Sequence, residues 1–136
     1  MAGIAFNNAS LGYVHALAHQ LGGFYNLPHG LCNAILLPAV MEYNLSSAID
    51  KYTDIARAMG IVTTGLSAEE SARLAVNSVR KLSQNLGLPQ KLSEVRGFKA
   101  KDIPTLATNA LRDVCCLTNP RQGTQEEIEE IYRSLL

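Results

Sequence analysis

Apolar residues recur every three or four positions along nearly the whole chain. Near the amino end, Ile4, Leu11, Val14, Ala18 and Leu21 follow this spacing. Residues at these steps share one face of an α-helix, whereas a half-buried strand needs strict alternation of apolar and polar residues. No alternating segment long enough for a sheet is present. The pattern therefore predicts an all-α fold of about six helices.

Glycine, proline and capping residues set the expected ends of these helices. Capping boxes, S-x-x-E at residues 67–70 and T-x-x-E at residues 124–127, mark the beginnings of two of them. The pair Gly22-Gly23 is expected to end the first helix, and Pro28 favours the start of the second. The six predicted helices cover residues 3–21, 28–40, 46–59, 67–86, 102–114 and 124–136.

Length and composition predict one folded domain, residues 1–136, with a proper hydrophobic core. Apolar residues make up 47% of the chain and charged residues 18%, which is a globular composition. Twelve basic and twelve acidic side chains cancel, so no nucleic-acid partner is expected. The longest apolar stretch, residues 34–41, is too short for a membrane span, and the amino end does not resemble a signal peptide.

The cysteines indicate free thiols. Cys32, Cys115 and Cys116 are odd in number, the last two are adjacent in sequence, and no C-x-x-C motif occurs. Adjacent cysteines pair only with strain, and a structural zinc site normally needs closely spaced cysteine pairs. We therefore expect buried or half-buried thiols in a cytoplasmic protein, and the sequence gives no support for a catalytic cysteine.

All three histidines of the chain, His15, His19 and His29, fall within fifteen residues of one another. Histidine is the commonest metal ligand and titrates nearest neutral pH. His15 and His19 are four residues apart and share one face of a helix, and a glycine turn can bring His29 back toward them. The residues alone permit two or three imidazoles around one cation, or a proton-transfer site. The competing interpretation makes the histidines packing or capping groups of helices.

A zinc-protease site and a glycine-rich phosphate-binding loop are excluded because their sequence motifs are absent. The helix of zinc proteases needs H-E-x-x-H, but Ala16 follows His15 and no glutamate lies in this segment. Neither G-x-G-x-x-G nor G-x-x-x-x-G-K occurs, so the chain does not carry the loop that usually holds nucleotide phosphates.

Two segments around the histidines carry a recognisable signature. Residues 2–23 read AGIAFNNASLGYVHALAHQLGG, and residues 26–38 read NLPHGLCNAILLP. These segments resemble the signature of the iron-containing (group III) alcohol dehydrogenases. Their sequence is most similar to that of the branch of propanediol and bacillary methanol dehydrogenases. The resemblance is specific through about Asn44. It is weaker but consistent to the end of the chain, where residues 87–89 and 119–121 resemble turns of that family.

The resemblance implies a fold and a set of roles. In that family, which has a dehydroquinate-synthase-like fold, an α/β dinucleotide-binding domain precedes an all-helical carboxy-terminal domain, and the site lies in the cleft between them. The metal is held by an aspartate, a histidine four residues later, and two signature histidines that correspond to His15 and His29. His19 corresponds to a histidine that binds no metal, faces the nicotinamide and substrate, and is a candidate for proton relay.

The resemblance also implies that this sequence is a carboxy-terminal fragment, because no aspartate here precedes a histidine by four residues. It implies an NAD(P)-dependent enzyme that oxidises small primary alcohols or diols, or reduces the aldehydes. Fe²⁺ is the first candidate for the metal, with Zn²⁺ or Mn²⁺ as alternatives. We expect the fragment to bind metal weakly, to transfer no hydride, and to self-associate as a homo-oligomer through exposed apolar surface.

Two other interpretations stay open. A stand-alone helical interaction or structural module would use the histidines for packing and would not respond to metal. A structural zinc site shared by two chains would instead make dimerisation depend on metal. Asn33, one helical turn after His29, is near enough to orient that imidazole, or it serves only as a packing amide.

Overall fold

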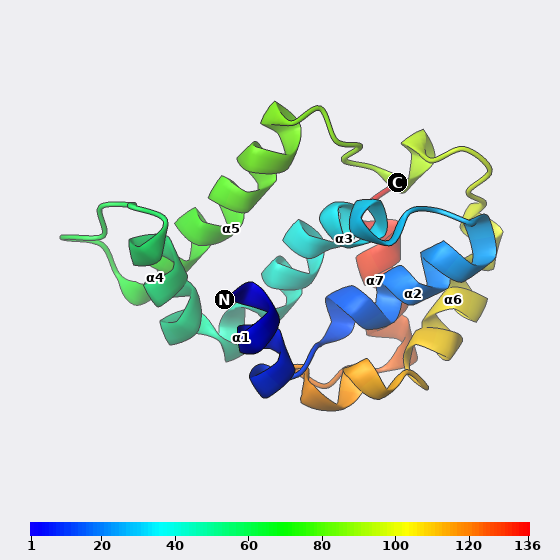
Figure 1. Cartoon of the computed structure of the whole chain (residues 1–136), viewed down its shortest axis with the longest axis horizontal. Coiled ribbons are helices and arrows are strands. Elements are labelled where there is room, and N and C mark those ends of the chain that lie inside the picture. The colour runs from blue at the N-terminus through cyan, green and yellow to red at the C-terminus, as the bar shows by residue number, and fades with distance from the viewer.

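Every regular element is helical in the part of the chain that the structure describes (Figure 1). The structure is a computed structural model that describes the backbone of residues 1–136 and the side chains of Met1 and residues 3–136. The α-helices are α1 (Ala2–Ala9), α2 (Tyr13–Tyr25), α3 (His29–Asn44), α4 (Ile49–Ala58), α5 (Ala68–Asn85), α6 (Ile103–Ala110) and α7 (Gln125–Arg133). The 3₁₀ helices are η1 (Leu45–Ser47), η2 (Leu92–Glu94), η3 (Ala100–Asp102) and η4 (Val114–Thr118). The all-α prediction is confirmed.

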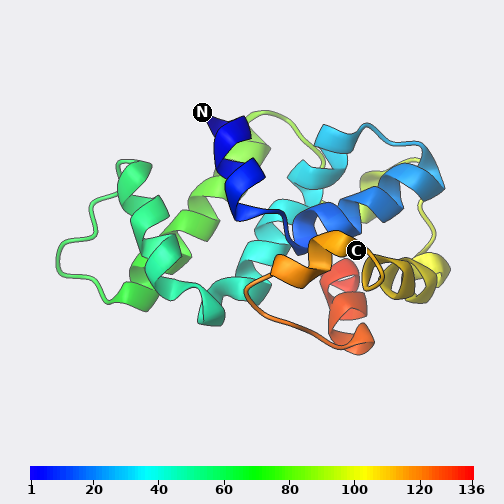
Figure 2. The ribbon, with the colours of Figure 1, turned by 60° about the horizontal axis from the view of Figure 1, so that its bottom comes forward.

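The helices form a main body and a side hairpin. In the body, α2 packs against α3 and α6, and α6 packs against α7. Helices α4 and α5 form the hairpin, which contacts the rest of the molecule mainly through α3 and also through η1 (Figures 1 and 2). Helix α1 projects from the body at the amino end, as Figure 2 shows. Helix α3 therefore connects the two parts.

The core lies where α2, α3, α6 and α7 meet. Its fully buried side chains include one large apolar group from each helix: Leu17, Leu36, Leu106 and Ile128. Burying a side chain of this size stabilises a protein by about 1.5–3 kcal/mol. The hydroxyl of Tyr132 donates to the carbonyl of Leu17 at 3.0 Å and so fixes α7 to α2 within this core.

The prediction of a single helix over residues 3–21 is wrong, because the helix is interrupted between α1 and α2. Ser10 has a left-handed φ of 63°, and Gly12 is extended at the start of α2. The side-chain oxygen of Asn119 accepts a hydrogen bond from the backbone N–H of Tyr13 at 3.1 Å. This contact with a residue far along the chain fixes the first turn of α2, and local periodicity carries no sign of it.

The glycine pair at positions 22 and 23 does not end the helix as predicted. Helix α2 continues to Tyr25 and ends where Asn26 has a left-handed φ of 52°. Each glycine disfavours a helix by about 1 kcal/mol. Burial of Leu21 and a hydrogen bond from the Tyr25 hydroxyl to Asp102, at 2.8 Å, hold the last turns in place.

The other helices lie where the sequence predicts them, with shifted ends. Both capping boxes are present, at the beginnings of α5 and α7. Helix α3 begins at His29 and continues past the predicted end to Asn44. Helix α6 stops early, at Ala110, and the side chain of Asp113 caps η4 by accepting a hydrogen bond from the backbone N–H of Cys115.

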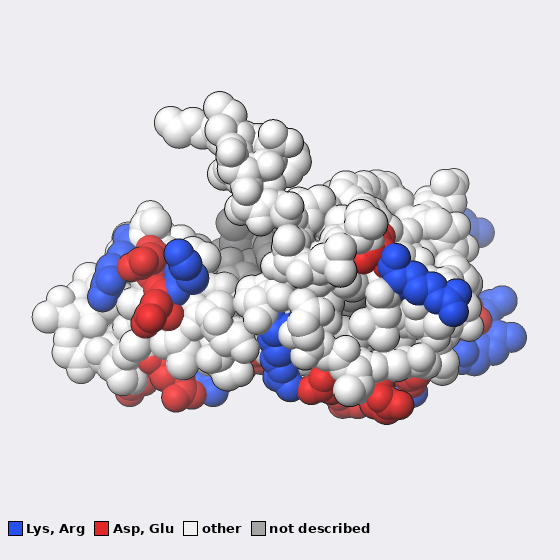
Figure 3. Space-filling model, turned by 90° about the horizontal axis from the view of Figure 1, so that it is seen from below, with Lys and Arg blue, Asp and Glu red and all other residues white. Residues whose placement is uncertain are grey.

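The surface carries both signs of charge close together. Figure 3 shows Lys and Arg beside Asp and Glu on the face that it draws, with an uncharged projection that corresponds to α1. On this helix, the side chains of Ile4 and Phe6 are 71% and 54% exposed. None of the described helices is long and apolar enough to cross a membrane.

Candidate metal centre

The three histidines that the sequence singled out lie together at the contact between α2 and α3. The ring centroids of His15 and His29 are 5.3 Å apart, and those of His19 and His29 are 5.5 Å apart. The rings of His15 and His19 are 6.2 Å apart on the same face of α2. His15 is half-buried, and His19 and His29 are exposed. The glycine turn expected between them is replaced by the turn at residues 26–28.

A buried pair of asparagines fixes the relative position of these two helices. Asn44, at the end of α3, donates to the Oδ1 of Asn119 at 3.0 Å, and Asn119 donates back at 2.7 Å. The same Oδ1 accepts the backbone N–H of Tyr13, the first residue of α2. The start of α2, the end of α3 and the segment after η4 are thus tied at one point, two residues before His15.

The spacing of the His15 and His29 rings is compatible with binding of one metal ion. Two imidazoles that share one ion, with metal–nitrogen bonds of about 2.1 Å, place their ring centroids about 5 Å apart. The observed 5.3 Å agrees with this spacing. Burial lowers the pKa of His15 below its usual value, and the neighbouring His29 and His19 lower it further against the opposing effect of Asp113. A lowered pKa keeps the imidazole neutral, which is the form that binds metal.

A hydrogen bond holds the ring of His29. The Nδ2 of Asn33, one turn further along α3, lies 2.9 Å from the Nε2 of His29. An amide nitrogen only donates, so this Nε2 accepts and the ring proton sits on Nδ1. The Oδ1 of Asn33 is buried and has no hydrogen-bond partner in the described structure. Asn33 therefore orients His29, and a cation at Nε2 has to displace its amide.

His19 has a different partner. Its Nδ1 lies 2.7 Å from Oδ2 of Asp113, and the side chains are 41% and 15% exposed. Burial raises the pKa of Asp113, but hydrogen bonds from the Cys115 backbone N–H and from His19 outweigh it and leave the pKa below its usual value. The ionised carboxylate holds the proton of His19 on Nδ1, which leaves Nε2 free to accept a proton.

Asp113 is a site residue that the sequence did not reveal. It lies in the loop before η4, far along the chain from α2, and contacts the site through the packing of η4 on α2. The sequence holds no local pattern that joins it to the histidines. Only the structure pairs it with His19.

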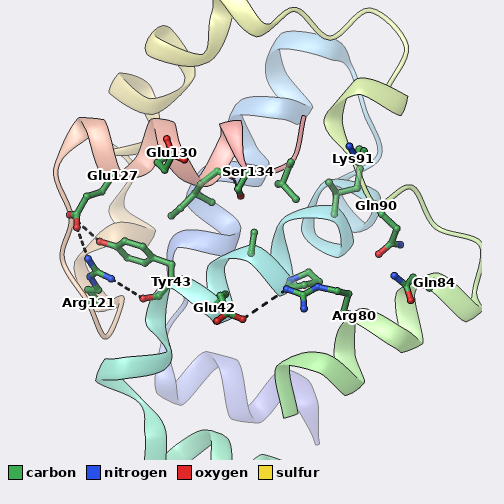
Figure 4. Close-up of a pocket in the computed structure, with 15 residues that line it drawn as sticks. Glu42, Tyr43, Arg80, Gln84, Gln90, Lys91, Arg121, Glu127, Glu130 and Ser134 are labelled. Atoms are coloured by element: carbon green, nitrogen blue, oxygen red, sulfur yellow. Dashed lines mark hydrogen bonds and ion pairs between the residues drawn. The ribbon is translucent and has the colours of Figure 1, made fainter. Parts of the chain in front are cut away.

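A separate cavity of about 590 Å³ lies between α3, α5 and α7 and does not include the histidines (Figure 4). Two ion pairs lie among its charged groups. Arg121 contacts Glu127 and lies over the ring of Tyr43 at 4.1 Å, while Arg80 lies 4.0 Å from Glu42. Lys91 and Glu130 line the cavity as well, but they are not part of these ion pairs.

The fold and the cluster define an all-helical domain with a histidine-lined site at its surface. The chain belongs to the Fe-containing alcohol dehydrogenase family, whose C-terminal part matches residues 1–136. The family resemblance seen in the sequence is thus confirmed, as is the expectation that these residues correspond to the helical C-terminal domain.

Similar proteins include enzymes that act on small alcohols or aldehydes. The chain is 51% identical to the 1,3-propanediol dehydrogenase of Citrobacter freundii over 133 residues, which are 98% of this chain and 34% of that protein. It is 50% identical to the lactaldehyde reductase of Escherichia coli (strain K12) over 134 residues, 98% of this chain and 35% of that protein. A crystal structure of 1,3-propanediol oxidoreductase superimposes with a TM-score of 0.96 at 49% identity, covering 99% of this chain and 35% of that one. The chain spans about a third of the length of these relatives.

Proposed function

We propose that this chain is the metal-binding carboxy-terminal part of an NAD(P)-dependent alcohol dehydrogenase. Its substrates would be small primary alcohols or diols, or the corresponding aldehydes in the reverse direction. The observation that carries the proposal is the meeting of His15, His19 and His29, with ring centroids 5.3 to 6.2 Å apart. The names of the relatives support the substrate class, because they include a propanediol dehydrogenase and a lactaldehyde reductase.

In this proposal, His15 and His29 hold a divalent cation. Fe²⁺ is the first candidate because the family is described as Fe-containing, and Zn²⁺ or Mn²⁺ are alternatives. When bound, the cation would polarise the alcohol oxygen and lower the pKa of its proton. In the structure Asn33 donates to Nε2 of His29, and a cation bound at that nitrogen would displace the amide. The free thiols of Cys32, Cys115 and Cys116 support a cytoplasmic location.

His19 is the proposed acid–base residue. Its Nε2 receives the proton of the alcohol during oxidation and returns one during reduction. Asp113, 2.7 Å from Nδ1, stabilises the imidazolium that forms and keeps the ring in a fixed orientation. The dinucleotide would be bound by residues outside this sequence, since neither common phosphate-binding motif occurs in it.

The test is anaerobic calorimetry of Fe²⁺ binding to the metal-free chain. We expect micromolar or weaker binding that disappears in His15→Ala and in His29→Ala, because two imidazoles alone make an incomplete set of ligands. His19→Ala is the matched control, since it removes a third imidazole from the same cluster and should leave Fe²⁺ binding intact. Equal binding by all variants, or no heat from the parent chain, would contradict the proposal.

A further inference from the structure

A second group of possible ligands lies beside the histidine pair. One ligand atom from each of His19, Asp113 and Cys115 lies within 4.8 Å of the other two, and this is the one such group of three among the residues that the structure describes. His19 comes from α2, and the other two come from the start of η4. Ligands of one zinc ion lie about 3 to 4 Å apart, so small side-chain rotations suffice to bring these atoms onto one cation.

The chain around Asp113 positions two of these groups. Its Oδ1 accepts the backbone N–H of Cys115 at 2.9 Å, while its Oδ2 faces Nδ1 of His19 at 2.7 Å. The neighbouring thiol points elsewhere, because Cys116 is buried and its Sγ donates to the carbonyl of Ala110. Of the two adjacent cysteines, only Cys115 therefore belongs to the group. Its backbone N–H is held by the carboxylate of Asp113.

We propose that His19, Asp113 and Cys115 form a second cation site, separate from His15 and His29, that takes borderline-soft divalent cations such as Zn²⁺ or Cd²⁺. Thiolate and imidazole ligands favour such ions over magnesium or calcium, and three protein ligands leave one position open for water. On binding, the Cys115 thiol gives its proton to solvent, and the neutral imidazole carries its proton on Nε2. One thiolate and one carboxylate then neutralise the charge of the cation.

A cation in this site removes His19 from proton transfer. Nδ1 becomes a ligand in place of a hydrogen-bond donor, so Nε2 keeps a proton and no longer accepts one from the alcohol. This consequence rests on the proposed role of His19 in the dehydrogenase, whereas the site itself does not. Thiophilic cations would accordingly inhibit an enzyme that contains this domain.

The test uses Cd²⁺ titrated into the fully reduced chain, followed by the ultraviolet charge-transfer absorption of the cadmium–thiolate bond. We expect a saturable absorption with one cation per chain that is lost in Cys115→Ser. Cys116→Ala is the matched control and should keep the absorption. Asp113→Asn should weaken Cd²⁺ binding by about tenfold or more, since even outer partners of metal ligands are worth ten- to a hundredfold in affinity.

His15→Ala and His29→Ala distinguish this site from the one proposed for Fe²⁺. Both variants should keep the cadmium–thiolate absorption even though they lose Fe²⁺ binding. Absence of the absorption in the parent chain, or its survival in Cys115→Ser together with its loss in Cys116→Ala, would overturn the second site. Loss of the absorption in His15→Ala or in His29→Ala would also overturn it, because one shared site would then explain both cations.

Discussion

At the scale of single residues, the side-chain amides of Asn44 and Asn119 connect the two helices that carry the histidines. Each donates to the other, and Oδ1 of Asn119 also accepts the first backbone N–H of α2. Both side chains are buried, so their polar atoms depend on these partners instead of water. A buried polar group that loses its partner costs about 1–3 kcal/mol. The pair therefore couples the stability of the fold to the position of the histidines.

We expect Asn44→Ala and Asn119→Ala each to lower the free energy of unfolding by about 1–3 kcal/mol. The double variant should lose less than the sum, because the second change removes a group that already lacks its partner. Urea unfolding of the four proteins measures this coupling. Asn77→Ala, an exposed amide on α5, is the control and should stay within about 0.5 kcal/mol. Additive losses would show that the two amides act independently.

Two glycines should respond to alanine in opposite directions. A Cβ at Gly123 would overlap the hydroxyl of Tyr43, whose ring is held by Arg121. Gly123→Ala should therefore destabilise the chain by about 1–3 kcal/mol. At Gly23, within α2, a Cβ meets nothing within 4 Å, so Gly23→Ala should stabilise it by about 0.5–1 kcal/mol. Thermal unfolding of both variants checks the signs, and a neutral Gly123→Ala would show that Tyr43 moves freely.

At the level of elements, helix α7 begins with a capping box that also carries charge. The Thr124 side chain accepts the backbone N–H of Glu127, and the Glu127 carboxylate accepts the backbone N–H of Thr124. This second bond, followed by the contacts with Arg121 and Tyr43, keeps the pKa of Glu127 below its usual value. The carboxylate is thus bound more strongly when it is ionised.

This lowered pKa predicts a specific loss of stability in acid. The unfolded chain takes up the proton of Glu127 near its usual pKa of 4.5, and the folded chain does so only at lower pH. The contribution of Glu127 is therefore fully present above about pH 4.5 and is lost as the pH falls through the folded pKa. Glu127→Gln should flatten this part of the pH dependence, as measured by urea midpoints between about pH 6 and pH 3. Glu130→Gln, on the same helix but outside the capping box, should not flatten it.

Elements whose ends depend on neighbouring residues could be predicted from the sequence, and those that depend on distant contacts could not. The capping boxes at Ser67 and Thr124 act over three residues, and both are present in the structure. The break at Ser10 depends on the contact of Asn119 with the first turn of α2, so the periodicity missed it. The three histidines were found because they are close in sequence, whereas Asp113 contacts His19 only after folding.

At the level of the whole molecule, the chain corresponds to only part of its relatives. It covers 34% of the propanediol dehydrogenase and 35% of the lactaldehyde reductase, and it contains neither common phosphate-binding motif. We expect the isolated chain to show no NAD(P)-linked oxidation of 1,3-propanediol in a spectrophotometric assay. His15→Ala, purified in parallel, controls for enzymes of the expression host. Turnover by the parent chain that is absent from this variant would refute the expectation.

Exposed apolar side chains gather where α1 meets η4. Phe6 from α1 and Val114 and Leu117 from η4 line one shallow hollow, and these three side chains are 54%, 77% and 79% exposed. The hollow also includes Cys115, so it adjoins the proposed second cation site. Exposed apolar surface of this kind is a candidate for contact with other protein surface.

We expect this surface to drive association of the isolated chain with itself. The molecular mass from sedimentation equilibrium should rise with concentration, because each contact removes the exposed rings and methyl groups of two chains from water. The double variant Phe6→Ser with Leu117→Ser should remain monomeric at concentrations where the parent chain associates. Val62→Ser is the control, since Val62 is 78% exposed in the loop between α4 and α5 and lies outside the hollow. If the control suppresses association as strongly as the double variant, general surface hydrophobicity and not this hollow is responsible.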